Sequence, residues 1–175
     1  RDFERNFSSS MNEFWSACQS VLSVLRQWPP SALIQVSSAG TVYGEAPGRP
    51  NVETDPPAPR SWYGRMKVVE EALYHQFAQD NDVPCVCARV TNPFGNVEYP
   101  THGLVDVLVD RVNKGVPVSL NFPEGASRDF IYGPEMARAL VTMANDPKPG
   151  VFNVGSGRSV FLSSLVGIVS ELAPS

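Results

Sequence analysis

The sequence predicts an α/β fold with a parallel sheet, on the strength of three observations. Helical and strand patterns alternate along the 175 residues, which favours parallel strands joined by helices. The stretch VPCVCARVT at 83–91 is almost continuously apolar, as expected of a strand buried on both faces. A hydrophobic content of 42% is enough for a core in a chain of this length.

The first half of the chain predicts two helices and two strands. Apolar residues on one helical face indicate a helix within 11–25, and the serines before them suit an N-cap. The apolar run LIQVSS at 33–38 is typical of a buried strand that ends in small polar residues. Proline, glycine and acidic residues favour a surface loop over 44–59. A second helix then runs to about Gln79, before the strand at 83–91.

The second half continues the alternation of helices and strands. Proline followed by glutamate at 134–135 is typical of a helix start. In order, we expect a helix at 103–115, a strand at 117–122, a turn at 123–129, a helix from Pro134, a strand at 151–157 and a helix at 162–172.

Composition narrows the class of partner. The formal net charge of -4, without a basic run, argues against nucleic acid and an anionic membrane, so we expect a small-molecule partner. Cys18, Cys85 and Cys87 are too few and too badly spaced for a disulfide framework or a zinc site. His75 and His102 lack further ligands at metal-binding spacing, so we expect no metal. Without a membrane-spanning stretch or a signal core, a cytoplasmic location is expected.

Tyr63 and Lys67 form the most informative pair in the chain. On a helix, residues four apart are neighbours on one face, so an ammonium can lie beside the phenol. A nearby positive charge favours the phenolate form, which suits a tyrosine that acts as a general base or acid. The spacing alone is also compatible with a surface tyrosine beside a solvated lysine. Glu70 and Glu71, further along this helix, are expected on a solvated face.

Four motifs in order accompany this pair: VSSAGTVYGE, ARVTNPFG, GASRDFIYGPEMARAL and VFNVGSGRSV. With them the chain resembles the extended short-chain dehydrogenase/reductases, specifically the NAD-dependent nucleotide-sugar epimerase/dehydratase family. The resemblance implies a partial Rossmann-type parallel sheet with flanking helices and a small mixed substrate-binding part. It places the second half of the NAD-binding domain in 1–95 and mainly substrate-binding segments in 96–175.

The resemblance also implies roles for residues of the first motifs. Tyr63 matches the tyrosine that moves the proton of a sugar hydroxyl. Lys67 matches the lysine that holds the nicotinamide ribose. Ser37 and Ser38 match the stretch that runs beside the cofactor, and Thr41 lies in the TVYG of epimerase-like members.

Residues of the later motifs match contacts to substrate and cofactor. Asn92 matches a residue that holds the substrate diphosphate, and Pro93 lies where the backbone approaches the nicotinamide. Arg128 matches the arginine of the nucleotide-diphosphate site, and a guanidinium fork suits phosphate. Arg128 could instead be a turn arginine paired with Asp129.

Two departures from the family pattern affect the expected chemistry. Ala39 stands where the catalytic Ser or Thr partner of the tyrosine usually lies, which leaves Ser38 and Thr41 as candidates for that hydroxyl. Gly40-Thr41 replaces the Asp-Glu of sugar dehydratases, which disfavours elimination of water. The Gly-x-x-Gly-x-x-Gly turn that binds the NAD pyrophosphate is absent from these residues, so a chain truncated at both ends is expected.

The resulting expectation is an NAD-dependent nucleotide-sugar epimerase of the UDP-hexose 4-epimerase type. Two alternatives stay open: a ketosugar reductase that uses the same Tyr63 and Lys67, and a non-catalytic fragment that binds a nucleotide-diphosphate sugar. Family members often dimerise through the tyrosine helix and the preceding helix, so a homodimer through 11–25 and 68–77 is a further expectation.

Overall fold

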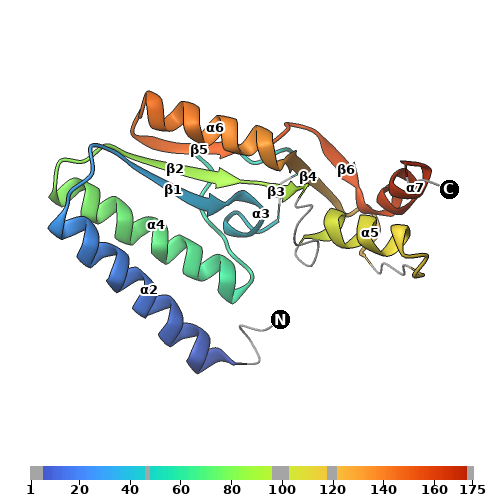
Figure 1. Cartoon of the computed structure of the whole chain (residues 1–175), viewed down its shortest axis with the longest axis horizontal. Helices are drawn as coiled ribbons and strands as arrows, with labels where there is room; N and C mark the ends of the chain where they lie inside the picture. The colour runs from blue at the N-terminus through green and yellow to red at the C-terminus, as the bar shows by residue number, and fades with distance from the viewer. Residues whose placement is uncertain (1–5, 46–47, 96–102, 118–121, 173–175) are drawn as a thin grey trace. The chain divides into compact units, whose positions relative to one another are not determined.

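The computed structural model describes residues 6–45, 48–95, 103–117 and 122–172 and confirms the α/β class. The chain divides into two compact units (Figure 1). Unit 1 comprises Arg1–Arg89 and Leu140–Asn153, and unit 2 comprises Val90–Ala139 and Val154–Ser175.

A three-stranded sheet forms the centre of unit 1. Its strands β1 (Leu33–Ser38), β2 (Cys85–Val90) and β5 (Gly150–Val154) lie in the order β1-β2-β5. Every residue of β2 is buried, as its nearly continuous apolar sequence predicted. Ala78, Val83 and Cys85 form a core cluster with Leu33 beside them, which attaches the end of the second helix to the sheet.

Helices cover this sheet on both sides (Figure 1). The helices α2 (Phe7–Gln27) and α4 (Trp62–Asp80) lie on one side, and α2 contacts α4. The unit 1 part of α6 (Gly133–Asn145), from Leu140 onward, lies on the other side. Both early helices were predicted, although Asn6 stands at the cap position of α2 and the serines lie inside its first turn.

The segment after β1 turns at once into α3 (Ala39–Val42), a helix of a single turn. It contacts α4, so the carboxyl end of β1 lies close to the start of α4. The described part of the expected 44–59 loop has no helix or strand, in agreement with its composition. The end of this loop is held to α3 by a hydrogen bond, in which the Ala58 amide donates to the Val42 carbonyl oxygen at 2.9 Å.

Unit 2 contains a second small sheet, in the order β3-β4-β6. Strand β3 (Asn92–Phe94) pairs in parallel with β4 (Ser127–Tyr132), which pairs antiparallel with β6 (Ser159–Phe161). The expected turn over 123–129 was therefore wrong at its end, because β4 begins at Ser127. The short strands β3 and β6 were not predicted, since three residues carry too little pattern.

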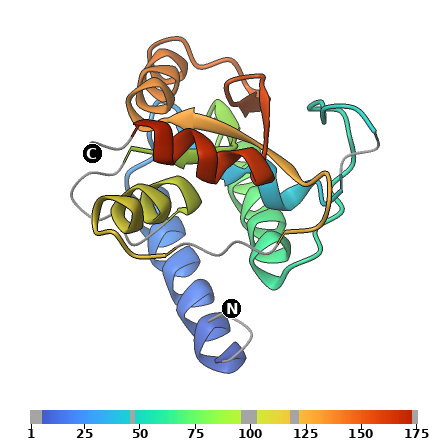
Figure 2. The same cartoon turned by 90° about the vertical axis from the view of Figure 1, so that its right-hand side faces the viewer.

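Two helices pack together in unit 2, as Figure 2 shows: α5 (Leu104–Asn113) and α7 (Leu162–Leu172). Leu108, Leu162, Leu165 and Val169 form their shared core. Both helices lie where the sequence predicted them. The strand expected at 117–122 falls mostly on 118–121, outside the described residues.

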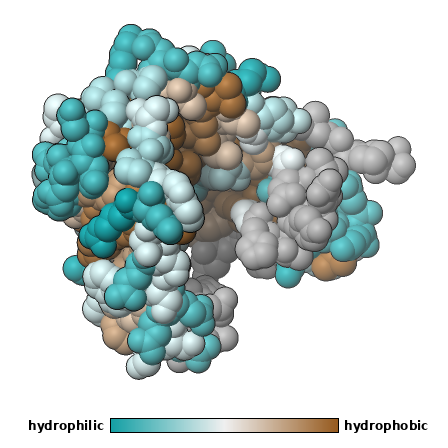
Figure 3. Space-filling view, turned by 60° about the vertical axis from the view of Figure 1, so that its left-hand side comes forward, coloured by the Kyte–Doolittle hydropathy of each residue, from teal (hydrophilic) through white to brown (hydrophobic). Residues whose placement is uncertain are grey.

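Apolar areas lie open at the surface beside hydrophilic ones (Figure 3). On α2 only Cys18 is fully buried, while the large side chains Trp15, Val21 and Val24 are exposed. None of the described helices is both long and apolar enough to cross a membrane.

Candidate active site

The start of α4 positions the predicted tyrosine and lysine. Ser61 caps the helix, and its side chain accepts a hydrogen bond from the Gly64 amide at 3.0 Å. Tyr63 is 51% exposed, so its hydroxyl is accessible at the surface of unit 1. Lys67 lies one turn further on and is half-buried, and its Nζ contacts Glu70 Oε2 at 2.6 Å.

The segment that carries Ser38 and Thr41 lies directly against this helix start. A Cβ added at Gly64 would lie 2.5 Å from the carbonyl oxygen of Thr41, so the two backbones are in contact. Thr41 Oγ1 donates to the Ser38 carbonyl oxygen at 3.5 Å, within the turn of α3. The structure therefore brings Ser38, Thr41 and the Tyr63 turn into one part of unit 1.

Ser37 differs from these residues because its side chain points into the interior. It is 3% exposed, and its Oγ donates to Glu71 Oε1 at 2.5 Å. In this structure the Ser37 hydroxyl is thus occupied by a carboxylate of α4. The other two candidate hydroxyls, those of Ser38 and Thr41, belong to residues that are partly exposed.

The expectation that Glu70 and Glu71 form a solvated face was wrong. The Glu71 side chain is 12% exposed and that of Arg89 in β2 is 5% exposed, and they form a two-pronged ion pair. Arg89 Nε lies 3.0 Å from Glu71 Oε1, and Arg89 Nη2 lies 2.7 Å from Glu71 Oε2. The Glu70 side chain is 21% exposed and is held by Lys67.

The electrostatics of this pair favour both charged forms. Burial raises the pKa of Glu71, but the hydrogen bonds from Arg89 and Ser37 outweigh it, and the net pKa is lowered. Burial lowers the pKa of Arg89, but the contacts with Glu71 and Tyr43 outweigh it and raise the pKa. The pair is therefore a charged ion pair inside unit 1.

The contacts of Arg89 extend to the third strand of the sheet. Its guanidinium carbon lies 4.7 Å from the centre of the Tyr43 ring, a cation–π distance. The Tyr43 hydroxyl donates to Asn153 Oδ1 in β5 at 2.8 Å. A polar network thus joins α4, β1, β2, the segment after α3 and β5.

The other predicted site residues lie in unit 2. Asn92 Nδ2 donates to the Asp129 carbonyl oxygen at 2.7 Å and so ties β3 to β4. Pro93 is exposed on β3. Arg128 is exposed, and its Nη1 donates to the Ser127 carbonyl oxygen at 2.8 Å.

Asp129 has a role that the sequence did not indicate. Its carboxylate accepts hydrogen bonds from the amides of Ser156 and Gly157, each at 2.9 Å, and from Ser156 Oγ at 2.7 Å. It therefore holds the glycine-containing turn after β5. The possible pairing of Arg128 with Asp129 is replaced in this structure by these contacts and by the contact of Arg128 with Ser127.

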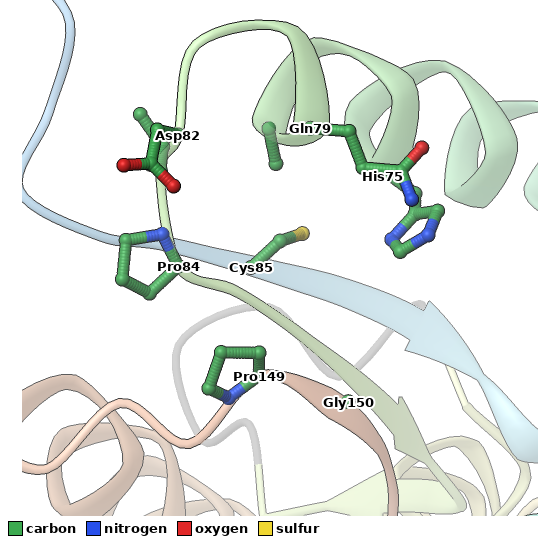
Figure 4. Close-up of a pocket in the computed structure, with 9 residues that line it drawn as sticks. His75, Gln79, Asp82, Pro84, Cys85, Pro149 and Gly150 are labelled. Atoms are coloured by element: carbon green, nitrogen blue, oxygen red, sulfur yellow. The ribbon is translucent and has the colours of Figure 1, made fainter.

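A shallow pocket of about 290 Å³ lies at the end of the unit 1 sheet that is opposite to the start of α4 (Figure 4). Its mainly apolar wall includes Pro84, Cys85 and Pro149, and His75 and Asp82 supply polar groups. It adjoins the amino ends of β2 and β5, whereas open α/β sheets bind ligands at the carboxyl ends. Every predicted site residue lies outside its lining, so the start of α4 remains the candidate site in unit 1. Across the described residues, no cluster of three His, Cys, Asp or Glu could hold a metal ion.

Sequence reasoning missed Glu71, Arg89 and Tyr43. One signal could have found the pair. Arg89 is a charged residue inside an otherwise apolar buried strand, and such a residue requires a partner. That the partner is Glu71 follows only from the folded structure, in which the helix face that carries Gly64 is turned toward the sheet.

The parallel sheet with flanking helices is the fold of Rossmann-like epimerases. The chain belongs to the NAD dependent epimerase/dehydratase family, whose model matches residues 9–155. Members of this family are NAD-dependent enzymes.

Individual relatives cover different reactions within this family. The chain is 27% identical over 137 residues to a dTDP-4-dehydro-6-deoxyglucose reductase of Escherichia coli, in a match that covers 77% of this chain and 43% of the relative. It is 28% identical over 129 residues to a UDP-glucose 4-epimerase of Mycolicibacterium smegmatis, with 71% and 41% covered.

The structural similarity likewise covers most of this chain and about half of the other protein. A crystal structure of the Thermus thermophilus UDP-glucose 4-epimerase in complex with NAD matches with a TM-score of 0.79 and 31% identity. The match covers 88% of this chain and 52% of that one. The chain thus spans about half the length of the proteins it resembles.

Proposed function

We propose that this chain carries the proton-transfer part of an NAD-dependent nucleotide-sugar epimerase of the UDP-hexose 4-epimerase type. The observation that supports this most is the exposed Tyr63 hydroxyl at the start of α4, with Lys67 one turn away. The backbone of this turn is pressed against the segment that carries Ser38 and Thr41. A general acid or base needs such an accessible and fixed position.

In the proposed reaction Tyr63 is the general base. Its phenolate oxygen takes the proton from a sugar hydroxyl and returns it when the opposite configuration is formed. When bound, NAD would accept a hydride from the carbon that bears this hydroxyl and would return it to the same carbon. Lys67 is paired with Glu70 in this structure, and on cofactor binding it would exchange Glu70 for the ribose hydroxyls.

The residues fit one end of NAD. Tyr63, Lys67, Ser38 and Thr41 present hydroxyls and an ammonium, which suit a ribose and a carboxamide. The 175 residues do not contain the glycine-rich turn that would hold the pyrophosphate. We therefore assign these residues only to the nicotinamide-ribose end of the cofactor.

The substrate diphosphate is assigned to Asn92 and Arg128 in unit 2. Arg128 is exposed, and a guanidinium binds phosphate oxygens with two parallel hydrogen bonds. The Asn92 amide can donate to a phosphate oxygen once it leaves the Asp129 carbonyl.

The similarity to a dTDP-4-dehydro-6-deoxyglucose reductase favours a second candidate, a ketosugar reductase. It would use the same Tyr63 but deliver the proton to a carbonyl oxygen and consume one reduced nicotinamide per turnover. An epimerase produces no net change in the cofactor, so absorbance at the nicotinamide band separates the two.

Calorimetric titrations of NAD, UDP and UDP-glucose into the chain test the binding part of the proposal. Binding of both NAD and UDP-glucose supports the epimerase. UDP-glucose binding that persists in Arg128→Met and Asn92→Ala would contradict the assigned diphosphate site. Sugar-nucleotide binding without NAD binding, and without turnover under any cofactor condition, would support the non-catalytic alternative, which Ala39 also favours.

A further inference from the structure

One carboxylate of α4 is bonded to two strands of the unit 1 sheet. Glu71 accepts from Ser37 Oγ in β1 and from two guanidinium nitrogens of Arg89 in β2. Because a two-pronged pair is directional, it restricts the rotation and the sliding of α4 over the sheet. A purely apolar contact would tolerate more of both.

The location of this pair relates it to the candidate site. Glu71 follows Lys67 by about one helical turn and Tyr63 by about two. Ser37 immediately precedes Ser38 at the carboxyl end of β1. The atoms joined by Glu71 therefore belong to the two segments that must be aligned for a sugar hydroxyl to meet Tyr63 and the Ser38 turn together.

A second contact fixes the distance between α4 and the turn that follows β1. Gly64 touches the Thr41 carbonyl so closely that a Cβ would not fit. Gly64 and Glu71 are seven residues apart and lie on the same helix face. Contacts at both positions hold the first three turns of α4 at a defined height and angle above β1.

Stability does not require an ion pair in this space. Replacement of a buried ion pair by apolar residues is often neutral or stabilising. Arg89 Nη1 and both amide atoms of the buried Gln35 also lack a hydrogen-bond partner in the described part of the chain. Stability alone therefore gives no reason for a charged pair here, whereas a directional link does.

We propose that Glu71 and Arg89 are positioning residues, which align the Tyr63 turn of α4 with the carboxyl end of β1. Neither residue touches the reacting atoms. The catalytic meaning of this alignment rests on the proposed function, but the alignment itself does not and can be measured separately.

The test compares four variants of the full chain. Arg89→Lys keeps the charge but loses the fork, and Glu71→Gln keeps the acceptor for Ser37 but loses the charge. The double variant Glu71→Leu/Arg89→Met fills the space with apolar groups. It should fold even if the single substitutions unfold the protein, because it leaves no unpaired buried charge. Arg49→Lys is the matched control, because Arg49 makes an equally two-pronged contact with Asp55 on the surface.

Amide hydrogen exchange along α4 measures how firmly the Tyr63 end of this helix is held against β1. We expect the amides of 65–71 to lose protection by about tenfold or more in Arg89→Lys and in the double variant. The amides of 75–80 should keep theirs, because Phe77 and Ala78 are packed in the core. Unchanged exchange at 65–71, or an equal loss along the whole helix, would overturn the positioning role.

Kinetics separate positioning from stability. In the double variant we expect the melting temperature to stay near that of the unmodified chain, while kcat falls about tenfold or more and KM changes little. If the double variant keeps full turnover, the ion pair has only a structural role and the positioning role is contradicted. An unmodified chain without turnover would refute the proposed function, and the exchange pattern would then decide the positioning role by itself.

Discussion

The backbone of Gly64 in α4 lies so close to Thr41 that an added Cβ would stand 2.5 Å from the Thr41 carbonyl oxygen. This contact brings the helix of Tyr63 against the turn that follows β1. A side chain at position 64 would force the two segments apart. Glycine is therefore required here for a packing reason, at the point where the candidate site is formed.

Substitution of Gly64 should destabilise the protein although alanine is a better helix former. We expect Gly64→Ala to lower the free energy of unfolding by about 1–3 kcal/mol, since the clash is with backbone atoms. Gly167 in α7 is the matched control, because a Cβ there meets nothing within 4 Å. Gly167→Ala should raise stability by about 0.5–1 kcal/mol. Urea titration measures both, and a stabilised Gly64→Ala would contradict the close packing.

Tyr63→Phe should separate binding from chemistry. Because Tyr63 is 51% exposed, removal of its hydroxyl should leave the melting temperature almost unchanged. Binding of UDP-glucose should persist, while turnover falls by a factor of about 10²–10⁴. Tyr132→Phe, at a tyrosine that is 45% exposed in unit 2, is the control and should retain full turnover. Equal losses in both variants would argue against a specific role of Tyr63.

Loss of Asp129 should loosen the turn after β5. The carboxylate accepts bonds from Ser156 and Gly157, so Asp129→Ala leaves their donors without this acceptor. We expect a loss of about 1–3 kcal/mol in stability and faster exchange of the 156 and 157 amides. Asp146→Ala, at an exposed surface pair with Lys148, should change neither quantity. Unchanged exchange in Asp129→Ala would contradict the anchoring role.

Alkaline pH should weaken unit 1 through two buried groups. Burial raises the pKa of Tyr74 to about 12 and that of Cys87 to about 12, whereas an unfolded chain releases these protons near pH 10 and 9. Between those values the unfolded state binds fewer protons, so stability falls as pH rises from about 9 to 12. Urea titrations from pH 8 to 11 measure the slope. Cys87→Ala should flatten the part that begins near pH 9, and an unchanged slope would contradict the assignment to Cys87.

The sequence predicted the elements with strong patterns. The buried strand β2 lies where its continuous apolar run indicated, and the helices α5, α6 and α7 lie where the sequence predicted them, α6 from its Pro-Glu start. The short strands β3 and β6 escaped prediction because three residues show no periodicity and are held by pairing with β4. The first residues of β4 read as a turn because Gly125 and Asp129 favour one locally.

The candidate site was predicted only in part. Tyr63 and Lys67 followed from helical spacing together with the accompanying motifs. The ion pair of Glu71 with Arg89 joins positions 18 apart, and its existence depends on which helix face covers the sheet. That face is a tertiary property, so local sequence left Glu71 looking like a solvated residue. The roles assigned to Ser37, Ser38, Thr41, Asn92, Pro93 and Arg128 stay predictions.

The most direct test of the proposed function is NMR observation of UDP-glucose with the chain and a sub-stoichiometric amount of NAD. We predict inversion at the sugar C4 to give UDP-galactose, no net reduction of NAD, and loss of this conversion in Tyr63→Phe. Conversion that is unaffected by Tyr63→Phe, or accumulation of reduced cofactor in proportion to product, would contradict the proposed epimerase reaction.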